Sequence, residues 1–226
     1  MTDFNQTFFE AYLRVFPNKI VYTDNFPIEM KGSEKDEEGW IEWKPIRGTL
    51  EESSYHQIEK NLGALFPQSF INWHKSFFFL DGDCSILRLP YSNPSQPLEE
   101  IKRHLNWFIP EQLIPQKIYP FGDEGNDIGL LIFDGRKSAA DNEFPIRFYD
   151  NEYGGDLNGL SEIIFSSFTK LLECVAHYLT ELQTRRNFEI IPDFFKIDAN
   201  GAGSTGIDYW LSWSSMQKAN FEEFGD

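Results

Sequence analysis

The sequence predicts an α+β fold built around an antiparallel sheet, with helices before and after it. Three observations support this prediction. Helical patterns dominate the first half of the chain. Short β-rich runs separated by turn-forming residues follow at 118–122, 128–134 and 145–150, which is typical of an antiparallel meander. A strongly amphipathic helix then comes at 166–182.

The N-terminal segment predicts one helix, one loop and one short strand. Apolar residues recur at helical spacing over residues 3–16, and Pro17 ends that pattern. Residues 31–39 are polar and charged, as expected of an exposed loop. The apolar positions over 40–46 then favour a short strand.

The next segment predicts two helices joined by a tight connection. Residues 51–63 have helical character, with Ser53 or Ser54 as the cap and Gly63 as the C-terminal stop. Pro67 favours the start of the second helix, because its fixed backbone suits the first helical turn. The remaining elements expected before the sheet are a strand at 85–90 and a helix at 97–108.

The helix at 166–182 has the clearest pattern in the chain, and Ser166 or Ser167 is its expected cap. The aromatic residues of the C-terminal tail are expected to pack back on the domain. The chain therefore divides into an N-terminal helix and acidic extension packed on the main domain, a main domain, and a C-terminal extension. Their expected bounds are 1–53, 54–184 and 185–226.

Composition disfavours several classes of protein. The 226 residues include 36 acidic and 20 basic side chains, for a net charge of −16. This charge repels phosphate backbones and anionic lipid, and it steers a basic protein partner toward the chain. Cys84 and Cys174 lie among apolar residues and are expected to be buried thiols. Because the chain has no basic, apolar leader and no apolar run of about 18 residues, we expect a cytoplasmic protein.

The acidic residues gather in two parts of the chain. Residues 1–53 hold 11 acidic and 6 basic side chains, and residues 119–160 hold 9 and 3. Residues 54–118 hold 6 of each, so the stretch between the two blocks is neutral. The second acidic block coincides with the predicted meander.

The glycine-rich sequence GAGSTG at 201–206 matches the G-x-G-x-x-G pattern of a dinucleotide-binding fold. Only 20 residues follow it. That leaves no room for the crossover helix, the second strand and the ribose-binding acid, so a flexible turn is favoured over a nucleotide site.

No other pattern indicates a reaction centre. The four histidines are far apart in sequence, and the carboxylates at 81–83 and 122–127 lack the order of a calcium loop. No nucleophile elbow is present. The sequence therefore predicts a binding protein with no catalytic residues, no cofactor and no metal.

Four segments within residues 55–180 occur in a recognisable order. They are a helical opening with Glu59, Leu62, Gly63 and Pro67, the hairpin IYPFGDEGNDIGLLIFD, the strand PIRFYDNE, and the helix SSFTKLLECVAHYL. In this order and spacing they resemble the SUKH superfamily, which includes many bacterial immunity proteins and a yeast regulator of cell-wall synthesis. Asn126 stands where that family often has a second glycine, and the chain extends beyond the resemblance at both ends.

The resemblance implies a twisted, largely antiparallel sheet flanked by helices, and a function in binding. Bacterial members neutralise polymorphic toxins, often nucleases, which tend to be basic because they bind nucleic acid. We therefore expect a non-catalytic immunity protein that binds a cognate, basic, nuclease-type toxin. The alternative is a regulatory scaffold that binds a housekeeping protein. A nucleotide-binding enzyme that uses the glycine-rich sequence is less favoured.

The expected contact face combines carboxylates of the second acidic block with two tyrosines as aromatic anchors. A solvated acidic surface without a partner is the alternative interpretation of these residues. The predicted contact residues are Asp123, Glu124, Asp127, Tyr149, Asp150, Glu152, Tyr153 and Asp156.

Overall fold

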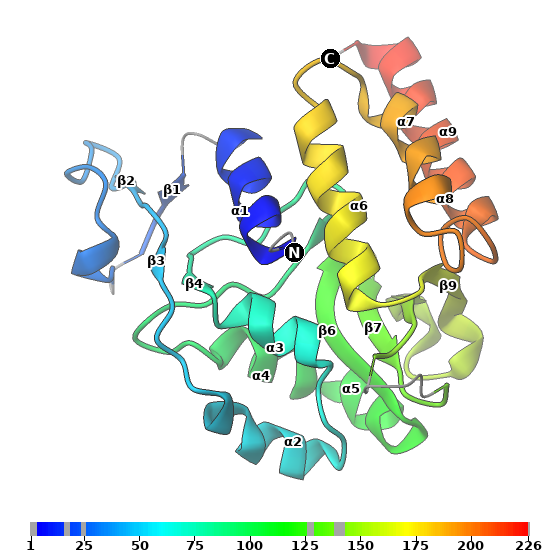
Figure 1. Cartoon of the computed structure of the whole chain (residues 1–226), viewed down its shortest axis with the longest axis horizontal. Coiled ribbons are helices and arrows are strands. Elements are labelled where there is room, and N and C mark those ends of the chain that lie inside the picture. Colours follow the sequence, from blue (N-terminus) through cyan, green and yellow to red (C-terminus); the bar gives the residue numbers. More distant parts are fainter. Residues whose placement is uncertain (1–3, 16–18, 24–25, 126–128, 138–142, 226) are drawn as a thin grey trace.

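An antiparallel sheet of five strands lies at the centre of the structure (Figure 1). Its strands follow the order β5-β6-β7-β8-β9, so neighbours in sequence are also neighbours in the sheet. This computed structural model, which describes residues 4–15, 19–23, 26–125, 129–137 and 143–225, confirms the predicted α+β fold. The strand bounds are Leu87–Arg88 (β5), Ile118–Glu124 (β6), Gly129–Asp134 (β7), Ile146–Asp150 (β8) and Leu160–Phe165 (β9).

The three predicted β-rich runs form the central strands β6, β7 and β8. All six residues of β7 are buried, because helices or loops cover the sheet on both faces. β9 was not predicted. In its sequence LSEIIF, the adjacent polar residues Ser161 and Glu162 lie on the half-buried edge of the sheet and interrupt the alternation of a strand.

The larger hydrophobic core lies on one face of the sheet, under helices α1, α3 and α6. The rings of Phe121 and Phe133 stack with centroids 4.0 Å apart. Phe70 of α3 and Phe168 of α6 meet these rings edge-on, so aromatic packing joins the helices to the strands. The helix bounds are Phe4–Val15 (α1), Gln68–His74 (α3) and Phe168–Glu181 (α6).

A smaller cluster of apolar residues lies on the opposite face, where α5 covers Leu130 and Ile132 of β7. The helix predicted at 97–108 is present but shorter, and a second short helix that was not predicted follows it over this face. These helices are Glu99–Leu105 (α4) and Phe108–Leu113 (α5).

The ends of the predicted helices are confirmed in three places and wrong in one. Ser167 caps α6 by accepting from the Lys170 amide at 3.2 Å. Gly63 ends α2 with a left-handed φ of 68°, which favours glycine, and α3 begins directly after its proline. Ser53 and Ser54 do not cap α2, since both lie in a preceding 3-10 turn. The bounds are Glu52–Tyr55 for that turn (η2) and His56–Leu62 for α2.

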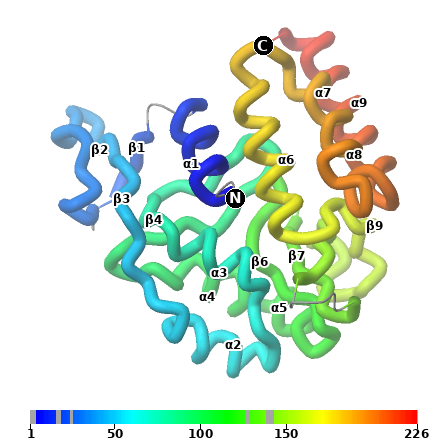
Figure 2. Tube along the Cα trace, viewed as in Figure 1, coloured from blue at the N-terminus to red at the C-terminus, as the bar shows by residue number. Residues whose placement is uncertain are grey.

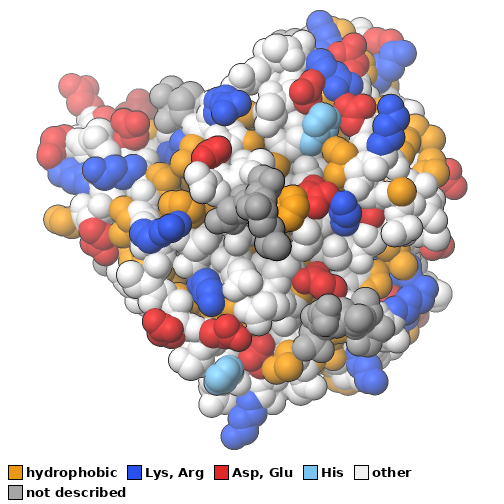
Figure 3. Space-filling view, viewed as in Figure 1, with side chains coloured by type: hydrophobic (Ala, Val, Ile, Leu, Met, Phe, Trp, Pro, Cys, Tyr) orange, Lys and Arg blue, Asp and Glu red, His pale blue; other side chains and the backbone are white. Residues whose placement is uncertain are grey.

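The N-terminal extension contributes three short strands to two small antiparallel pairs beyond α1 (Figures 1 and 2), and the fourth strand, Phe77–Phe78, comes from the main domain. In the space-filling view, acidic and basic side chains lie together over this part of the molecule (Figure 3). α1 itself packs along α6 and contributes to the larger core. The strand bounds are Ile20–Val21 (β1), Ile41–Glu42 (β2), Ile46–Arg47 (β3) and Phe77–Phe78 (β4).

The C-terminal helices lie on the other side of α6 from α1 (Figure 2). Trp210 and Trp213 of α9 are buried, and the Trp210 indole donates to the Ile164 carbonyl of β9 at 3.1 Å. This packing confirms that the aromatic tail folds back on the domain. The helix bounds are Asn187–Ile190 (α7), Phe194–Ile197 (α8) and Ile207–Phe224 (α9).

Two smaller findings complete the fold. Cys84 and Cys174 are both buried free thiols, as predicted. Within the described residues, no helix combines the length and the apolar character needed to cross a membrane.

Candidate functional site

The strand register brings part of the predicted contact face to one end of the sheet. Asp123 of β6 lies opposite Arg88 of β5, and Asp150 of β8 lies opposite Gly129 of β7. Asp127, predicted to belong to the same face, lies outside the described residues. The chain leaves β8 at this end through residues 150–156, which we call the acidic loop.

The acidic loop is held in one shape by its own hydrogen bonds. The Tyr149 hydroxyl accepts from the Gly155 amide at 2.6 Å and donates to the Asp156 carbonyl at 3.1 Å. The carboxylates of Asp150 and Asp156 each accept a backbone amide two residues further on, both at 2.9 Å. Such Asx turns fix the backbone of a short loop without help from the core.

The loop presents three carboxylates and one aromatic ring at the surface. Glu152 and Asp156 are exposed, Asp150 is half-buried, and Tyr153 is 50% exposed. The loop contains no lysine or arginine. Four of the predicted contact residues are therefore brought together as an accessible acidic surface with an aromatic centre.

Tyr149 and Glu124 do not belong to that surface, which corrects the prediction. Tyr149 is fully buried, because its ring packs with Leu130 while its hydroxyl supports the loop. Glu124 is 3% exposed. Burial, with a smaller contribution from the Glu124 charge, raises the pKa of the Tyr209 hydroxyl, which places Glu124 near α9 and away from the loop.

Asp123 lies in a neighbouring hollow of about 350 Å³, which we call the charged cleft. Its carboxylate lies 2.9 Å from His104 Nε2 and 3.2 Å from the Arg103 guanidinium. Arg103 also pairs with Glu100 at 2.9 Å. Burial alone would raise the pKa of Asp123, but the hydrogen bonds and charges of His104 and Arg103 outweigh burial and hold it below its usual value.

The carboxylates of the sequence DGD at 81–83 also line the charged cleft. Asp81 accepts the Asp83 amide at 2.9 Å, and Asp83 accepts the Ser85 amide at 2.7 Å. These carboxylates therefore shape the turn. No group of three or more ligand-forming side chains that could hold a metal occurs within the part of the chain that the structure describes.

One hydrogen-bond acceptor in the charged cleft lacks a donor among the described residues. Asn151 lines the cleft, and its side-chain oxygen is buried with no hydrogen-bond partner among the described residues. A buried oxygen without a donor is unfavourable, so it would be stabilised by a donor from a bound partner.

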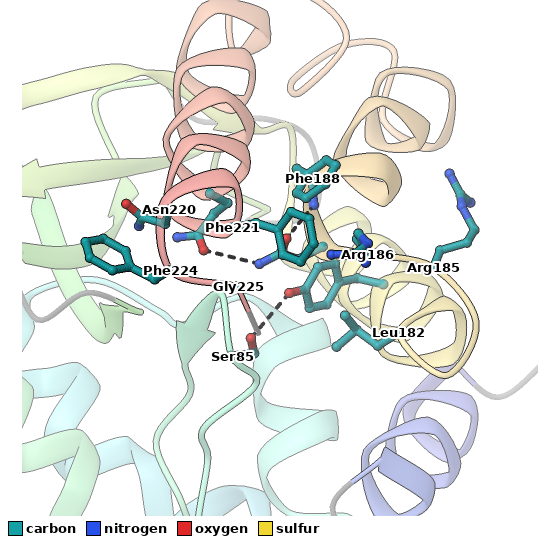
Figure 4. Close-up of a pocket in the computed structure, with 12 residues that line it drawn as sticks. Ser85, Leu182, Arg185, Arg186, Phe188, Asn220, Phe221, Phe224 and Gly225 are labelled. Carbon is teal, nitrogen blue, oxygen red and sulfur yellow. Dashed lines mark hydrogen bonds between the residues drawn. The ribbon is translucent and has the colours of Figure 1, made fainter.

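A second and larger hollow, of about 560 Å³, lies beside α9 (Figure 4). We call it the α9 pocket. The end of α6, the start of α7 and the C-terminal half of α9 form its walls, and Ser85 lies at its base. Sequence reasoning missed this pocket, although Gln217, Asn220, Phe221 and Phe224 have the spacing of one helix face.

The glycine-rich sequence at 201–206 forms a turn, as predicted. The buried carboxylate of Asp198 accepts from the amides of Gly201 and Ala202 at 3.1 and 3.4 Å. A side chain added to Gly201 would meet this carboxylate and the Ser166 amide. The amides that a phosphate-binding loop would offer to its ligand are therefore directed at a carboxylate of the chain itself.

Comparison with known proteins adds no relative. No protein-family model matches the chain, and no curated protein matches it. The SUKH resemblance therefore stays a prediction from the residues that carry it.

Proposed function

We propose that this chain is a non-catalytic protein-binding domain, and that the acidic loop is the surface with which it binds a basic protein. The observation that supports this most is the loop's combination of order and exposure. Its backbone is fixed by the Tyr149 hydroxyl and two Asx turns, while Tyr153 and the carboxylates around it stay accessible. A surface that is already ordered loses little entropy on binding.

The chemistry of the loop selects a basic partner. Carboxylates at residues 150, 152 and 156 surround Tyr153 with no compensating cation in the loop. Lysine and arginine side chains complement such a surface, and a half-exposed tyrosine is a frequent anchor at the centre of an interface. The unpaired oxygen of Asn151 adds an acceptor for a donor that enters the charged cleft.

The SUKH resemblance suggests which basic protein this is. We propose a polymorphic toxin of the nuclease type, which the chain would neutralise in the cytoplasm by covering its nucleic-acid-binding surface. The net charge of −16 supports this proposal, because it would steer a basic nuclease toward the chain at long range.

The test is binding to the protein encoded by the adjacent gene, measured by calorimetry after co-purification. We expect Tyr153→Ala to weaken binding about 30-fold, as loss of a central anchor worth about 2 kcal/mol does. Reversing two loop charges, in the double variant Glu152→Lys and Asp156→Lys, should weaken it further and slow association.

The matched control reverses two exposed carboxylates of the N-terminal extension, Glu37→Lys and Glu38→Lys. It changes the net charge by the same amount away from the loop. Equal weakening by both double variants would show general charge attraction and contradict a specific contact at the loop. Failure of the adjacent gene product to bind the wild-type chain would contradict the toxin proposal itself.

A further inference from the structure

A further hollow, of about 320 Å³, lies between α2 and α4, and we call it the α2–α4 pocket. Helix α2 and the turn before it form one wall, α4 forms the other, and the turn Ile114–Gln116 (η3) contributes one side chain. Residues 150–156 are not among the described residues that line it. The pocket is therefore separate from the acidic loop, the surface proposed for a basic partner.

The floor of the α2–α4 pocket is aliphatic. Ile58 and Leu62 are one turn apart on the same side of α2. Leu98 and Leu105 face them from the two ends of α4. Ile58 and Leu105 are buried, whereas Leu62, Leu98 and Ile114 are half-buried and pack against the larger core. The core therefore fixes the floor and leaves part of its apolar surface in contact with water.

This floor favours an alkyl chain over an aromatic ring. The chain contains 22 phenylalanines, yet no aromatic side chain is among the described residues of the lining. An aromatic ligand would find no ring with which to stack or to pack edge-on. An alkyl chain needs only apolar surface, and it would remove the exposed part of the floor from water.

The rim of the pocket offers hydrogen-bond donors. The side-chain nitrogen of Gln57 lies 2.9 Å from the side-chain oxygen of Asn61, one turn further along α2. If both amides are flipped, Asn61 donates to Gln57 instead. In either orientation this bond uses one carbonyl oxygen and leaves the amino group of the other amide as a donor.

Lys102 of α4 adds a positive charge at the rim, and it is the one charged residue among the described residues that line the pocket. Its ammonium lies 4.0 Å from the Glu99 carboxylate, and at least half of each side chain is exposed. An exposed ion pair of this kind stabilises little. A carboxylate bound in the pocket can therefore compete with Glu99 for the ammonium.

We propose that the α2–α4 pocket binds a free aliphatic monocarboxylate of medium chain length. Its alkyl chain would cover the floor, and its carboxylate would accept from Lys102 and from the amide pair at the rim. A volume of about 320 Å³ is at the lower end of the range of small-molecule sites, which suits a chain of about six to eight carbons. An amine of the same length would bring a second positive charge to Lys102.

The experiment is a titration of the ¹⁵N-labelled full chain with hexanoate and, separately, with hexanamide, followed by NMR. The two probes share the alkyl chain and differ in the charge of the head group. For hexanoate we expect saturable shifts at amides of α2 and α4 in the millimolar range. Hexanamide should bind about tenfold more weakly, because its uncharged head forms no ion pair with Lys102.

Chain length tests the floor. Two further methylenes buried on the floor tighten binding by up to about tenfold, so affinity should rise from butanoate through hexanoate to octanoate. The same affinity for all three acids would show attraction to the lysine alone and would reject an aliphatic site.

Two pocket variants and one control make the result specific. Lys102→Gln removes the ammonium and should weaken hexanoate about tenfold while changing hexanamide little. Leu98→Ala shortens the floor and should weaken octanoate severalfold and butanoate less. The control is Lys60→Gln, because Lys60 is an exposed lysine of α2 that does not line the pocket. It removes the same charge and should leave binding unchanged.

Three further outcomes overturn the proposal. They are equal affinity for hexanoate and hexanamide, equal weakening by the Lys102 and Lys60 variants, and no saturable shift at α2 and α4 with millimolar octanoate. None of these results bears on the acidic loop, so the two proposals stand or fall separately.

Discussion

The acidic loop and the α9 pocket use their polar groups in opposite ways. The loop is convex, and its carboxylates offer acceptors around one exposed ring. The pocket is concave, and its described lining includes two arginines, Gln217 and three phenylalanine rings. Net charge describes the first region but not the second, because Arg185 and Arg186 line a pocket of a chain whose net charge is −16.

The two regions also differ in how the chain builds them. The loop and its supports come from ten consecutive residues, 149–158, so its geometry is mostly local. The pocket gathers Ser85, the end of α6, the start of α7 and one face of α9. The loop should therefore depend on its own turns, whereas the pocket should depend on contacts that hold α9 to the domain. The following predictions test this difference.

The largest effect is expected at Asp198, which anchors the turn before α9. Its buried carboxylate accepts from the Ser166 amide at 2.7 Å and from the Ser166 hydroxyl at 2.6 Å, besides the two amides of the turn. Asp198→Ala would leave these donors unpaired and lower the unfolding free energy by about 3 kcal/mol. Urea denaturation measures this loss.

Hydrogen exchange would then locate the effect of Asp198→Ala. Amides of α9 should exchange faster by more than the loss of global stability accounts for. Amides of the acidic loop should exchange faster only by the amount that this loss accounts for. Asp198→Asn keeps some of the hydrogen bonds and serves as the milder control. Equal acceleration in both regions would contradict the separation between them.

An intermediate effect is expected at Tyr149. Tyr149→Phe removes the hydroxyl that joins Gly155 to Asp156 and should lower the unfolding free energy by about 1–2 kcal/mol. The Gly155 amide should exchange faster, and α9 should be unaffected. Tyr119→Phe in β6 is the control, because no hydrogen bond to the Tyr119 hydroxyl is present in the described structure. Unchanged exchange at Gly155 would show that the turns alone hold the loop.

The smallest effect is expected from pH at the charged cleft. The pKa of Asp123 is lower in the folded chain than the usual value of about 4. Its charged form therefore contributes stability above that usual value, and this contribution is lost as the pH falls through the lower, folded pKa. Asp123→Asn should flatten the acid limb of a plot of unfolding free energy against pH. An unchanged slope would show that His104 and Arg103 do not stabilise the carboxylate.

Sequence reasoning predicted the parts of the fold whose pattern is local. The β-rich runs of β6, β7 and β8, separated by turn-forming residues, predicted the sheet, and the amphipathic stripe of α6 predicted its main helix. It failed for β9, in which the adjacent polar residues Ser161 and Glu162 interrupt the pattern of a strand at the edge of the sheet. It also missed α5, which begins at Phe108 after the helix predicted at 97–108.

The structure divides the predicted contact face, because nearness in sequence does not determine which side chains reach the surface. Asp150, Glu152, Tyr153 and Asp156 are near neighbours in sequence and stay together on one loop. Glu124 follows Asp123 by one residue, yet strand alternation directs the two side chains to opposite faces of the sheet. Both residues are acidic, so composition alone predicts that both lie at the surface. The structure of β6 shows that Glu124 is buried.

The sequence by itself determined the fold class, the helix stop at Gly63, a cap at Ser166 or Ser167, and the acidic character of the loop after β8. These features follow from backbone preference, apolar periodicity and composition, which act over a few residues. Only the tertiary structure decided that Asp123 pairs with His104, that Asp198 occupies the glycine-rich turn, and that α9 closes a pocket against α6 and α7. Those arrangements join residues distant in sequence, and their geometry is set by how the helices pack on the sheet.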